Sequence, residues 1–305
     1  MEPRHLETLR TVGERGGVIA AAAALHCTPS AVSQQLKVLG RQAGVPLTER
    51  VGRGLRLTPA GAALAERAMD VAVALARAEA ACAEHLARPT GTVSVAAFQS
   101  AAQMLLPGLL RRTLALDGVV VQARDEDVAQ RAFPDLTADV DIVVAHRPDP
   151  THRWPAAVRV VPLLREPLDV AVPVGHRLAG RSGVTPEELV GERWIAVREG
   201  FPVAAVLAEI GRRGGQAPTV AHRINDFHVV EALVAAGHGI SLLPRYTADD
   251  RGGTRFSLVP LDGVPAGREI DALLRPDRAE RLVVRLVLDH LREEAAALTS
   301  SSAGR

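Results

Sequence analysis

The stretch TPSAVSQQLK, residues 28–37, carries hydrogen-bonding side chains at helical spacing and almost no charge. Thr28 is a favourable N-cap residue and Pro29 is favoured at the first helical position, so we expect a helix to begin here and to run to about Gly40. Its apolar residues share one face. The opposite face carries Ser30, Ser33, Gln34 and Lys37. These groups can hydrogen-bond base edges and phosphates without filling a DNA groove with bulk.

Arginines follow in the segment ERVGRGLRL, residues 49–57. The glycines predict a turn between two short extended pieces, which together form a β-wing. Arg50 and Arg53 lie in or beside this wing and could contact phosphates or the minor groove. The first 58 residues hold eight Lys and Arg against four Glu, so they are basic, whereas the rest of the chain has an excess of three acidic residues. This asymmetry favours a polyanion-binding head.

A second set of candidate residues follows predicted strands in the C-terminal part. Ligands of open α/β sheets bind beyond the carboxyl ends of the strands, where helix N-termini present free N–H groups. Ser100, the backbone N–H groups and Arg198 would favour a carboxylate. For three of these residues other roles stay open: His146 as a solvated loop residue, Asp226 as an N-cap, and Arg198 as a partner of Glu199 or Glu192. The expected cleft residues are Phe98, Gln99, Ser100, His146, Arg198, Gly200, Phe201, Asn225 and Asp226.

Other site chemistry is missing from the sequence. There is no GxSxG motif and no complete dinucleotide-binding glycine motif. The ten histidines are scattered, so we expect no metal site and no cofactor. The two cysteines, Cys27 and Cys82, offer no disulfide framework. No signal peptide and no apolar run long enough to span a membrane is visible, which favours a cytoplasmic protein and no membrane partner.

Two kinds of element must position these residues. Helices are expected at 3–14 and 18–25, before the polar helix and the wing. In proteins with a helix, a tight turn, a second helix and a wing, the second helix lies in the DNA major groove. Here that second helix is the polar helix that begins at Pro29. A long helix from 58 to about 88 carries a heptad-like seam at Leu64, Val71, Leu75, Ala78, Cys82 and Leu86, which indicates a helix partner or packing on its own domain. From residue 92 strands alternate with helices, which predicts βαβ units with largely parallel sheets in two lobes.

Residues 18–61 resemble the winged helix-turn-helix of LysR-type transcriptional regulators. The similarity lies in an Ala-rich helix, the opening TPSAVS, the wing entry GVPLTER and the segment LTPAG. Thr48 stands where the family usually has an aromatic residue, Gly40 where it has glutamate, and Pro29-Ser30 where it has a Gln-Pro pair. SAAQMLLPGLL at 100–110 and LVAAGHGISLLPR at 233–245 are similar to less specific segments of the family's effector domain.

The resemblance implies a multidomain fold: an all-α winged helix-turn-helix domain, a long linker helix, and an α/β two-lobed domain like the periplasmic binding proteins. The expected boundaries are 1–58, 59–90 and 91–305, with lobe 1 at about 91–163 and 267–305 and lobe 2 at about 164–266. The residues assigned to DNA are Thr28, Pro29, Ser30, Ser33, Gln34, Lys37, Arg50 and Arg53.

The function implied is transcriptional regulation without enzymatic activity. The expected partners are double-stranded operator DNA and a small-molecule effector, for which a carboxylate is one candidate. Further copies of the same chain are also expected, in a homodimer or a homotetramer. A contact with RNA polymerase is left open. Proteins of two other classes are alternatives: a solute-binding module whose N-terminal part only dimerises, and an enzyme built on the two-lobed fold. The first would be insensitive to DNA, and the second lacks any catalytic constellation.

Overall fold

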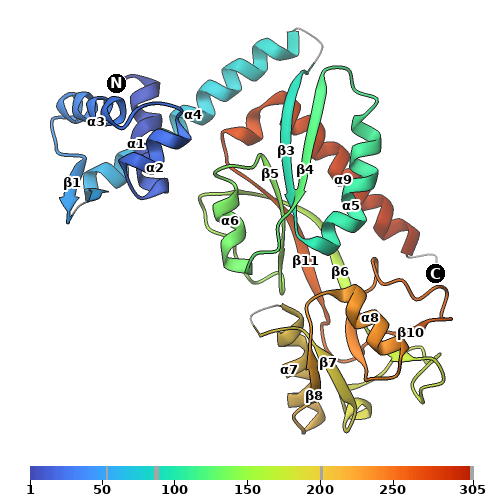
Figure 1. Cartoon of the computed structure of the whole chain (residues 1–305). Coiled ribbons are helices and arrows are strands. Elements are labelled where there is room, and N and C mark those ends of the chain that lie inside the picture. The colour runs from blue at the N-terminus through green and yellow to red at the C-terminus, as the bar shows by residue number, and fades with distance from the viewer. Residues whose placement is uncertain (53, 86–88, 200–201, 303–305) are drawn as a thin grey trace. The chain divides into compact units, whose positions relative to one another are not determined.

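The structure, a computed structural model, describes residues 1–52, 54–85, 89–199 and 202–302. The chain divides into two compact units (Figure 1). Unit 1 comprises Met1–Pro89 with Arg275–Arg285, and unit 2 comprises Thr90–Leu274 with Leu286–Arg305.

Unit 1 begins with three helices and a two-stranded wing. The helices are α1 (Pro3–Arg15), α2 (Val18–Ala24) and α3 (Pro29–Ala43), and the antiparallel wing strands are β1 (Thr48–Val51) and β2 (Gly54–Leu57). Leu9, Val32 and Leu39 are fully buried between the helices. The long helix α4 (Pro59–His85) follows, and the Thr58 hydroxyl accepts a hydrogen bond from Gly61 N at its start. The expected helix-turn-helix and wing are therefore present.

The polar helix α3 is longer than the sequence pattern predicted. Gly40 does not end it; the helix continues to Ala43, and Gly44 ends it with a left-handed φ of 72°. Gly44 N donates to Gly40 O at 3.0 Å. A glycine after the last turn is the usual helix terminator because it adopts this conformation without steric cost.

Unit 2 contains a mixed sheet of two parts joined by one long strand. Strands β3 (Gly91–Ala97), β4 (Val119–Asp125) and β5 (Ile142–Arg147) are parallel. The long strand β6 (Arg159–Pro173) pairs through its first half with β11 (Gly267–Leu274) and through its second half with β9 (Ser241–Pro244) and β10 (Phe256–Val259). The strands β7 (Arg193–Ala196) and β8 (Thr219–Arg223) form a separate parallel pair.

The prediction of largely parallel sheets was wrong for four of the seven strand pairings described in unit 2. β11 runs antiparallel to both β5 and β6, and β9 and β10 run antiparallel to β6. The cause is the path of the chain, because β6 leaves the first lobe and β11 returns to it beside β6. Residues 163 and 164, at the boundary predicted between lobe 1 and lobe 2, lie inside the continuous strand β6.

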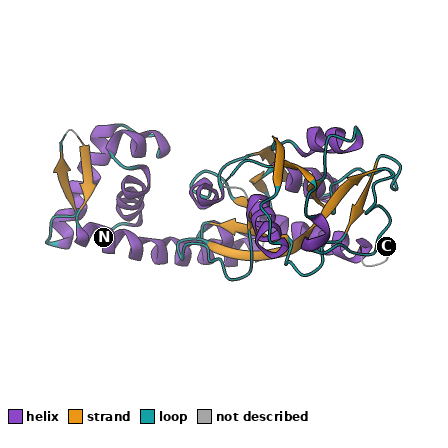
Figure 2. Cartoon of the chain, turned by 90° about the horizontal axis from the view of Figure 1, so that it is seen from below, coloured by secondary structure: helices purple, strands orange, loops and turns teal. Residues whose placement is uncertain are grey.

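Helices flank the strands of unit 2 (Figure 2). They are α5 (Gln99–Thr113), the short α6 (Phe133–Leu136), α7 (Pro202–Gly214), α8 (Phe227–Ala235) and α9 (Leu282–Ser302), whose first residues belong to unit 1. Two 3-10 turns of unit 2 lie at Gln130–Ala132 and Pro186–Leu189, and the 3-10 turn Arg278–Glu280 belongs to unit 1. Arg112 on α5 pairs with Glu294 on α9 at 3.0 Å, so these two helices lie side by side. Among the described residues, no helix is both long and apolar enough to cross a membrane.

Candidate functional site

The outer face of α3 is a row of exposed polar side chains. Ser30, Ser33, Gln34 and Lys37 are all exposed, whereas Val32 lies in the buried core of the same helix. This separation follows from the 3.6-residue period of the helix. The face can therefore offer hydroxyl, amide and ammonium groups to a ligand without opening the core.

Local hydrogen bonds fix the first turn of α3. The Thr28 hydroxyl accepts from Ala31 N at 3.2 Å and lies 3.0 Å from the Ser30 hydroxyl. The Ser33 hydroxyl donates to Pro29 O at 2.9 Å, so it presents its oxygen lone pairs outward. On the inner side, Thr8 of α1 donates to the Gln35 side chain. The helix thus has a fixed start and a fixed rotation against α1.

The wing supplies one exposed arginine to this surface. Arg50 on β1 is exposed and makes no ion pair with any described residue. Arg56 on β2 differs, because its Nη2 lies 2.7 Å from the Glu49 carboxylate. Arg50 is therefore the better placed of the two for a phosphate. Arg53, the other wing arginine predicted to contact DNA, lies outside the described residues.

Unit 2 holds a small cavity of about 40 Å³ at the ends of strands β3, β5, β7, β8 and β11. Phe98, Gln99 and Ser100 enter it at the start of α5, and His146 enters from β5. No side chain in the part of the chain that the structure describes caps the N-terminus of α5. The remaining lining residues are Asp127, Val197, Val203, Asn225, Phe227 and Arg268.

Three polar side chains form a buried cluster at this cavity. Arg268 on β11 lies directly opposite Glu166 on β6, and its Nε and Nη2 lie 2.7 and 2.5 Å from the Glu166 Oε2. Arg268 Nη2 also donates to the Ser100 hydroxyl at 2.6 Å. Its guanidinium stacks on the Phe98 ring, with 4.6 Å between the central carbon and the ring centroid. Burial raises the pKa of Glu166, and the charge of Arg268 opposes that rise.

His146 is buried against aromatic rings in the same region. Its ring lies 4.7 Å from the Phe98 ring and 5.2 Å from the Phe133 ring, centroid to centroid. Burial and then the positive charge of Arg268 lower the pKa of His146 to about 3. The imidazole is therefore neutral near pH 7, and it is not the solvated loop residue considered from the sequence.

Five of the predicted cleft residues line this cavity: Phe98, Gln99, Ser100, His146 and Asn225. Two do not. Arg198 is exposed, and only its backbone N–H approaches the site, donating to Asn225 Oδ1 at 2.8 Å. Asp226 caps α8 by accepting from His228 N at 2.9 Å. Gly200 and Phe201 lie outside the described residues.

The expected partners of Arg198 are engaged elsewhere. Glu199 pairs with Arg223 at 3.5 Å, and Glu192 pairs with Arg177 at 2.7 Å. The cation of the cavity is Arg268, which the sequence reasoning missed together with Glu166. The sequence does contain one signal of this pair. Glu166 and Arg268 are opposite charges inside strand-like segments, at the two points where the chain passes between the lobes.

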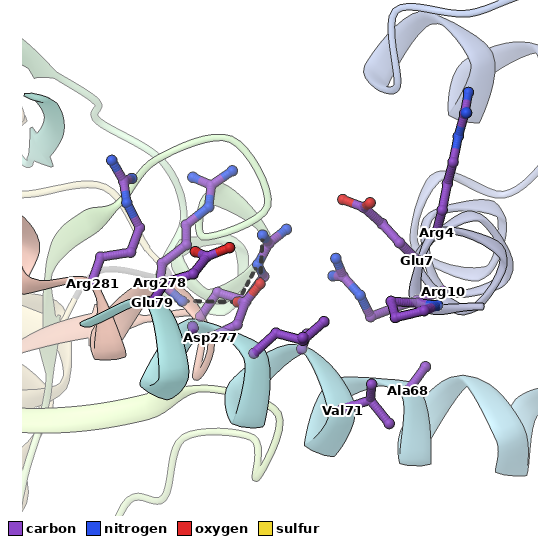
Figure 3. Close-up of a pocket in the computed structure, with 14 residues that line it drawn as sticks. Arg4, Glu7, Arg10, Ala68, Val71, Glu79, Asp277, Arg278 and Arg281 are labelled. Atoms are coloured by element: carbon purple, nitrogen blue, oxygen red, sulfur yellow. Dashed lines mark hydrogen bonds and ion pairs between the residues drawn. The ribbon is translucent and has the colours of Figure 1, made fainter. Parts of the chain in front are cut away.

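A larger cavity, of about 420 Å³, lies in unit 1 between α1, α4 and the segment Arg275–Arg285 (Figure 3). Its lining mixes arginines with carboxylates, and Arg275 Nε lies 2.7 Å from the Asp277 carboxylate. Burial opposes ionisation of Asp277, but the hydrogen bonds from Arg275 and the charges of Arg275 and Arg10 hold its pKa below the usual value. Of the sequence-predicted residues that the structure describes, only the seam residues Val71 and Leu75 of α4 line this cavity.

Comparison with known families decides the assignment. The family model described as the LysR substrate binding domain matches residues 86–296, and that of the bacterial regulatory helix-turn-helix protein, lysR family, matches residues 3–62.

The chain belongs to the LysR family of transcriptional regulators. Accordingly it is a DNA-binding regulator with an effector-binding domain. A LysR-family relative is the transcriptional regulator CbbR of Xanthobacter flavus, 28% identical over 308 residues that cover 99% of this chain and 90% of CbbR. Relatives of this kind are named as regulators, which places the chain in a family of regulators rather than of enzymes.

Solved structures share the LysR-family fold. A full-length OxyR variant from Pseudomonas aeruginosa aligns with a TM-score of 0.65 at 21% identity, covering 96% of this chain and 95% of OxyR. Full-length CbnR complexed with its target DNA aligns with a TM-score of 0.51 at 23% identity, covering 97% of this chain and all of CbnR, 100%. At these identities the likeness shows the fold.

Proposed function

We propose that this LysR-family regulator recognises its operator through α3 lying in the major groove. The observation that carries the proposal is the exposed, nearly uncharged polar face of α3, formed by Ser30, Ser33, Gln34 and Lys37. Amide and hydroxyl groups read base edges, whereas cations mainly contact phosphates. Thr28 and Pro29 set the start of the helix, and Arg50 with Arg53 contacts the DNA backbone beside it. CbnR, which has the same fold, has been solved in complex with its target DNA, and this supports DNA binding by a chain of this fold.

We further propose that α4 joins two copies. Val71 and Leu75, on the predicted seam, are 36% and 44% exposed in the single chain, and Ala78 and Cys82 are exposed as well. A partner helix would cover this apolar row. Two α3 helices would then meet half-sites about one DNA turn, roughly 34 Å, apart. Leu86, the last predicted seam residue, lies outside the described residues.

The effector proposed for the unit 2 cavity is a small carboxylate. Ser100, Arg268 and the uncapped N-terminus of α5 are the groups that a carboxylate prefers. The cavity of about 40 Å³ is far below the roughly 300–1,000 Å³ of usual ligand pockets. A larger carboxylate would therefore require the two lobes to move apart, and such a movement is the proposed link between the effector and DNA binding.

The proposed domain limits are 1–58 for the DNA-binding domain, 59–90 for the linker helix and 91–305 for the effector domain. We propose that the regulator works in the cytoplasm, where its operator is, as a homodimer or homotetramer. A contact with RNA polymerase would follow from a role as activator.

The test is binding of the full-length protein to the intergenic DNA beside its own gene. Salt and unlabelled random DNA are titrated into the reaction. Binding that survives random competitor and weakens with salt supports specific recognition, because each neutralised phosphate contributes to the salt slope. Equal loss of binding to any competitor would refute it.

Two variants separate reading of bases from contact with phosphates. Gln34→Ala should weaken binding to the operator but leave binding to random DNA unchanged. Arg50→Ala should weaken both and reduce the salt slope by about one. Identical effects of the two substitutions would contradict the roles assigned to Gln34 and Arg50.

A further inference from the structure

The buried cluster at the unit 2 cavity is already balanced in charge. Arg268 is 4% exposed and Glu166 is 0% exposed, and the two form one cation–anion pair. His146 adds no charge near neutral pH, because its pKa is about 3. An anion that binds Arg268 would therefore leave the site with a net negative charge in a medium of low dielectric, which is costly.

Glu166 is the group that can relieve this cost. Its Oε2 carries both contacts to Arg268, while its Oε1 is buried without a hydrogen-bond partner in the described part of the chain. A carboxylate with one bare oxygen is poorly stabilised in its ionised form, and burial also raises its pKa. Only the charge and hydrogen bonds of Arg268 oppose protonation, and a bound anion would weaken that opposition.

Other charged groups near the pair do not replace Glu166 in this role. Arg165 and Glu269, the neighbours of the pair on β6 and β11, bind each other at 2.9 Å, and side chains of adjacent strand residues point to opposite faces. Asp127 lines the cavity but is exposed, so water screens its charge. On β5 the facing group is the neutral His146.

We propose that Glu166 is a built-in counter-anion of Arg268 that takes up one proton from solvent when an anionic effector binds there. The proton converts the Glu166 carboxylate to the neutral acid, and the effector's negative charge replaces it beside Arg268. No bond between heavy atoms forms or breaks. Effector binding by this regulator is then coupled to pH, and Glu166 selects against ligands of more than one negative charge. The inference rests on the proposed anion site at Ser100 and Arg268.

Acetate is the probe, with acetamide as its neutral counterpart of similar shape. The melting temperature of the full-length protein is measured against acetate concentration at pH 6, 7 and 8, with sodium chloride holding the ionic strength, and the apparent Kd is taken from the stabilisation. Acetate stays ionised throughout. Because binding takes up one proton, acetate binding by the wild type should weaken as the pH rises, by up to about tenfold per pH unit. Acetamide binding should not change with pH.

Glu166→Gln keeps the shape of Glu166 and removes its charge. We expect the variant to melt at a lower temperature without acetate, because Arg268 loses its counter-ion, and to bind acetate tightly at all three pH values. Glu192→Gln, at a half-buried carboxylate outside the cavity that pairs with Arg177, is the matched control and should keep the wild-type pH dependence. If Glu166→Gln does not fold, the wild-type pH series decides alone.

Two results would overturn the inference, and they differ in what else they remove. Acetate binding by the wild type that changes less than twofold between pH 6 and 8 refutes proton uptake and leaves the anion site standing. Absence of any acetate effect at pH 6 in both the wild type and Glu166→Gln refutes the anion site as well.

Discussion

Burial sets the protonation state of His146, and this makes the stability of unit 2 depend on pH. The folded protein lowers the pKa of His146 from 6.5 to about 3. Between these values the unfolded chain binds a proton that the folded chain does not. Above pH 6.5 His146 is neutral in both states and does not reduce the free energy of unfolding. Below pH 6.5 protonation of the unfolded chain lowers the free energy of unfolding, by up to about 1.4 kcal/mol per pH unit.

Replacing His146 by Gln should remove this contribution. We expect the variant to be less stable than the wild type at pH 7, because it fits the aromatic surroundings less well, but to lose less stability between pH 6.5 and pH 4. Chemical denaturation at several pH values measures both differences. His290→Gln, at a half-buried histidine paired with Glu293 at 3.3 Å, is the matched control. Equal losses in wild type and His146→Gln would contradict burial as the cause.

Two arginines near the cavity show what the sequence could and could not predict about the site. Arg198 follows the end of a strand, and that position is visible in the sequence, but the structure leaves its side chain in solvent. Arg268 lies inside β11, where it meets Glu166 across the strand pair. This pairing depends on an antiparallel register between segments about one hundred residues apart. Periodicity reports local structure only, so it could predict Ser100 at a helix start but not Arg268.

At the scale of elements, helix ends were predictable where the capping residues are explicit. Thr28 and Asp226 precede α3 and α8 as N-caps. The end of α3 was misplaced at Gly40, because a glycine inside a helix and a glycine that ends one look alike in a sequence. The direction of β11 was also missed, since strand patterns carry no information on parallel or antiparallel pairing. Tertiary packing decided both.

Substitution by alanine should change stability in opposite directions at Gly40, inside α3, and at Gly44, directly after its end. Gly40 lies inside the helix, and a Cβ there would meet only Val45 O, at 3.8 Å. Gly40→Ala should stabilise the DNA-binding unit by about 0.5–1 kcal/mol, since alanine loses less conformational entropy. Gly44→Ala, at a φ of 72°, should destabilise it by about 1 kcal/mol. Calorimetry of the full chain tests the pair, and changes of the same sign would be inconsistent with these backbone assignments.

Asp226 should act on stability and not on effector binding. Its carboxylate accepts from His228 N at 2.9 Å and Val229 N at 3.4 Å, so Asp226→Ala should cost about 1 kcal/mol. Acetate binding should stay within twofold of the wild type. Asn225→Ala is the contrasting variant. Asn225 lines the cavity, so loss of its side chain should weaken acetate binding. Weaker acetate binding by Asp226→Ala would instead return this residue to the site.

At the scale of the whole molecule, the proposed recognition of the operator uses two α3 helices at a fixed spacing, and a single chain supplies one. Half-site recognition multiplies specificity only when the copies are joined. The exposed apolar row of α4 is the surface proposed for that junction. It contains Val71 and Leu75, the two large apolar side chains that are exposed among the described residues of α4.

Leu75→Glu should separate the proposed dimer, because it places a charge in the centre of the apolar row, where a partner helix would desolvate it. Ala81→Glu adds the same charge at an exposed position about 120° around the helix and is the control. Sedimentation equilibrium should show a shift toward monomer for Leu75→Glu only. The same variant should lose most operator affinity while a single half-site is bound as in the wild type. An unchanged oligomer in Leu75→Glu would place the junction elsewhere and leave the row on α4 without its proposed partner.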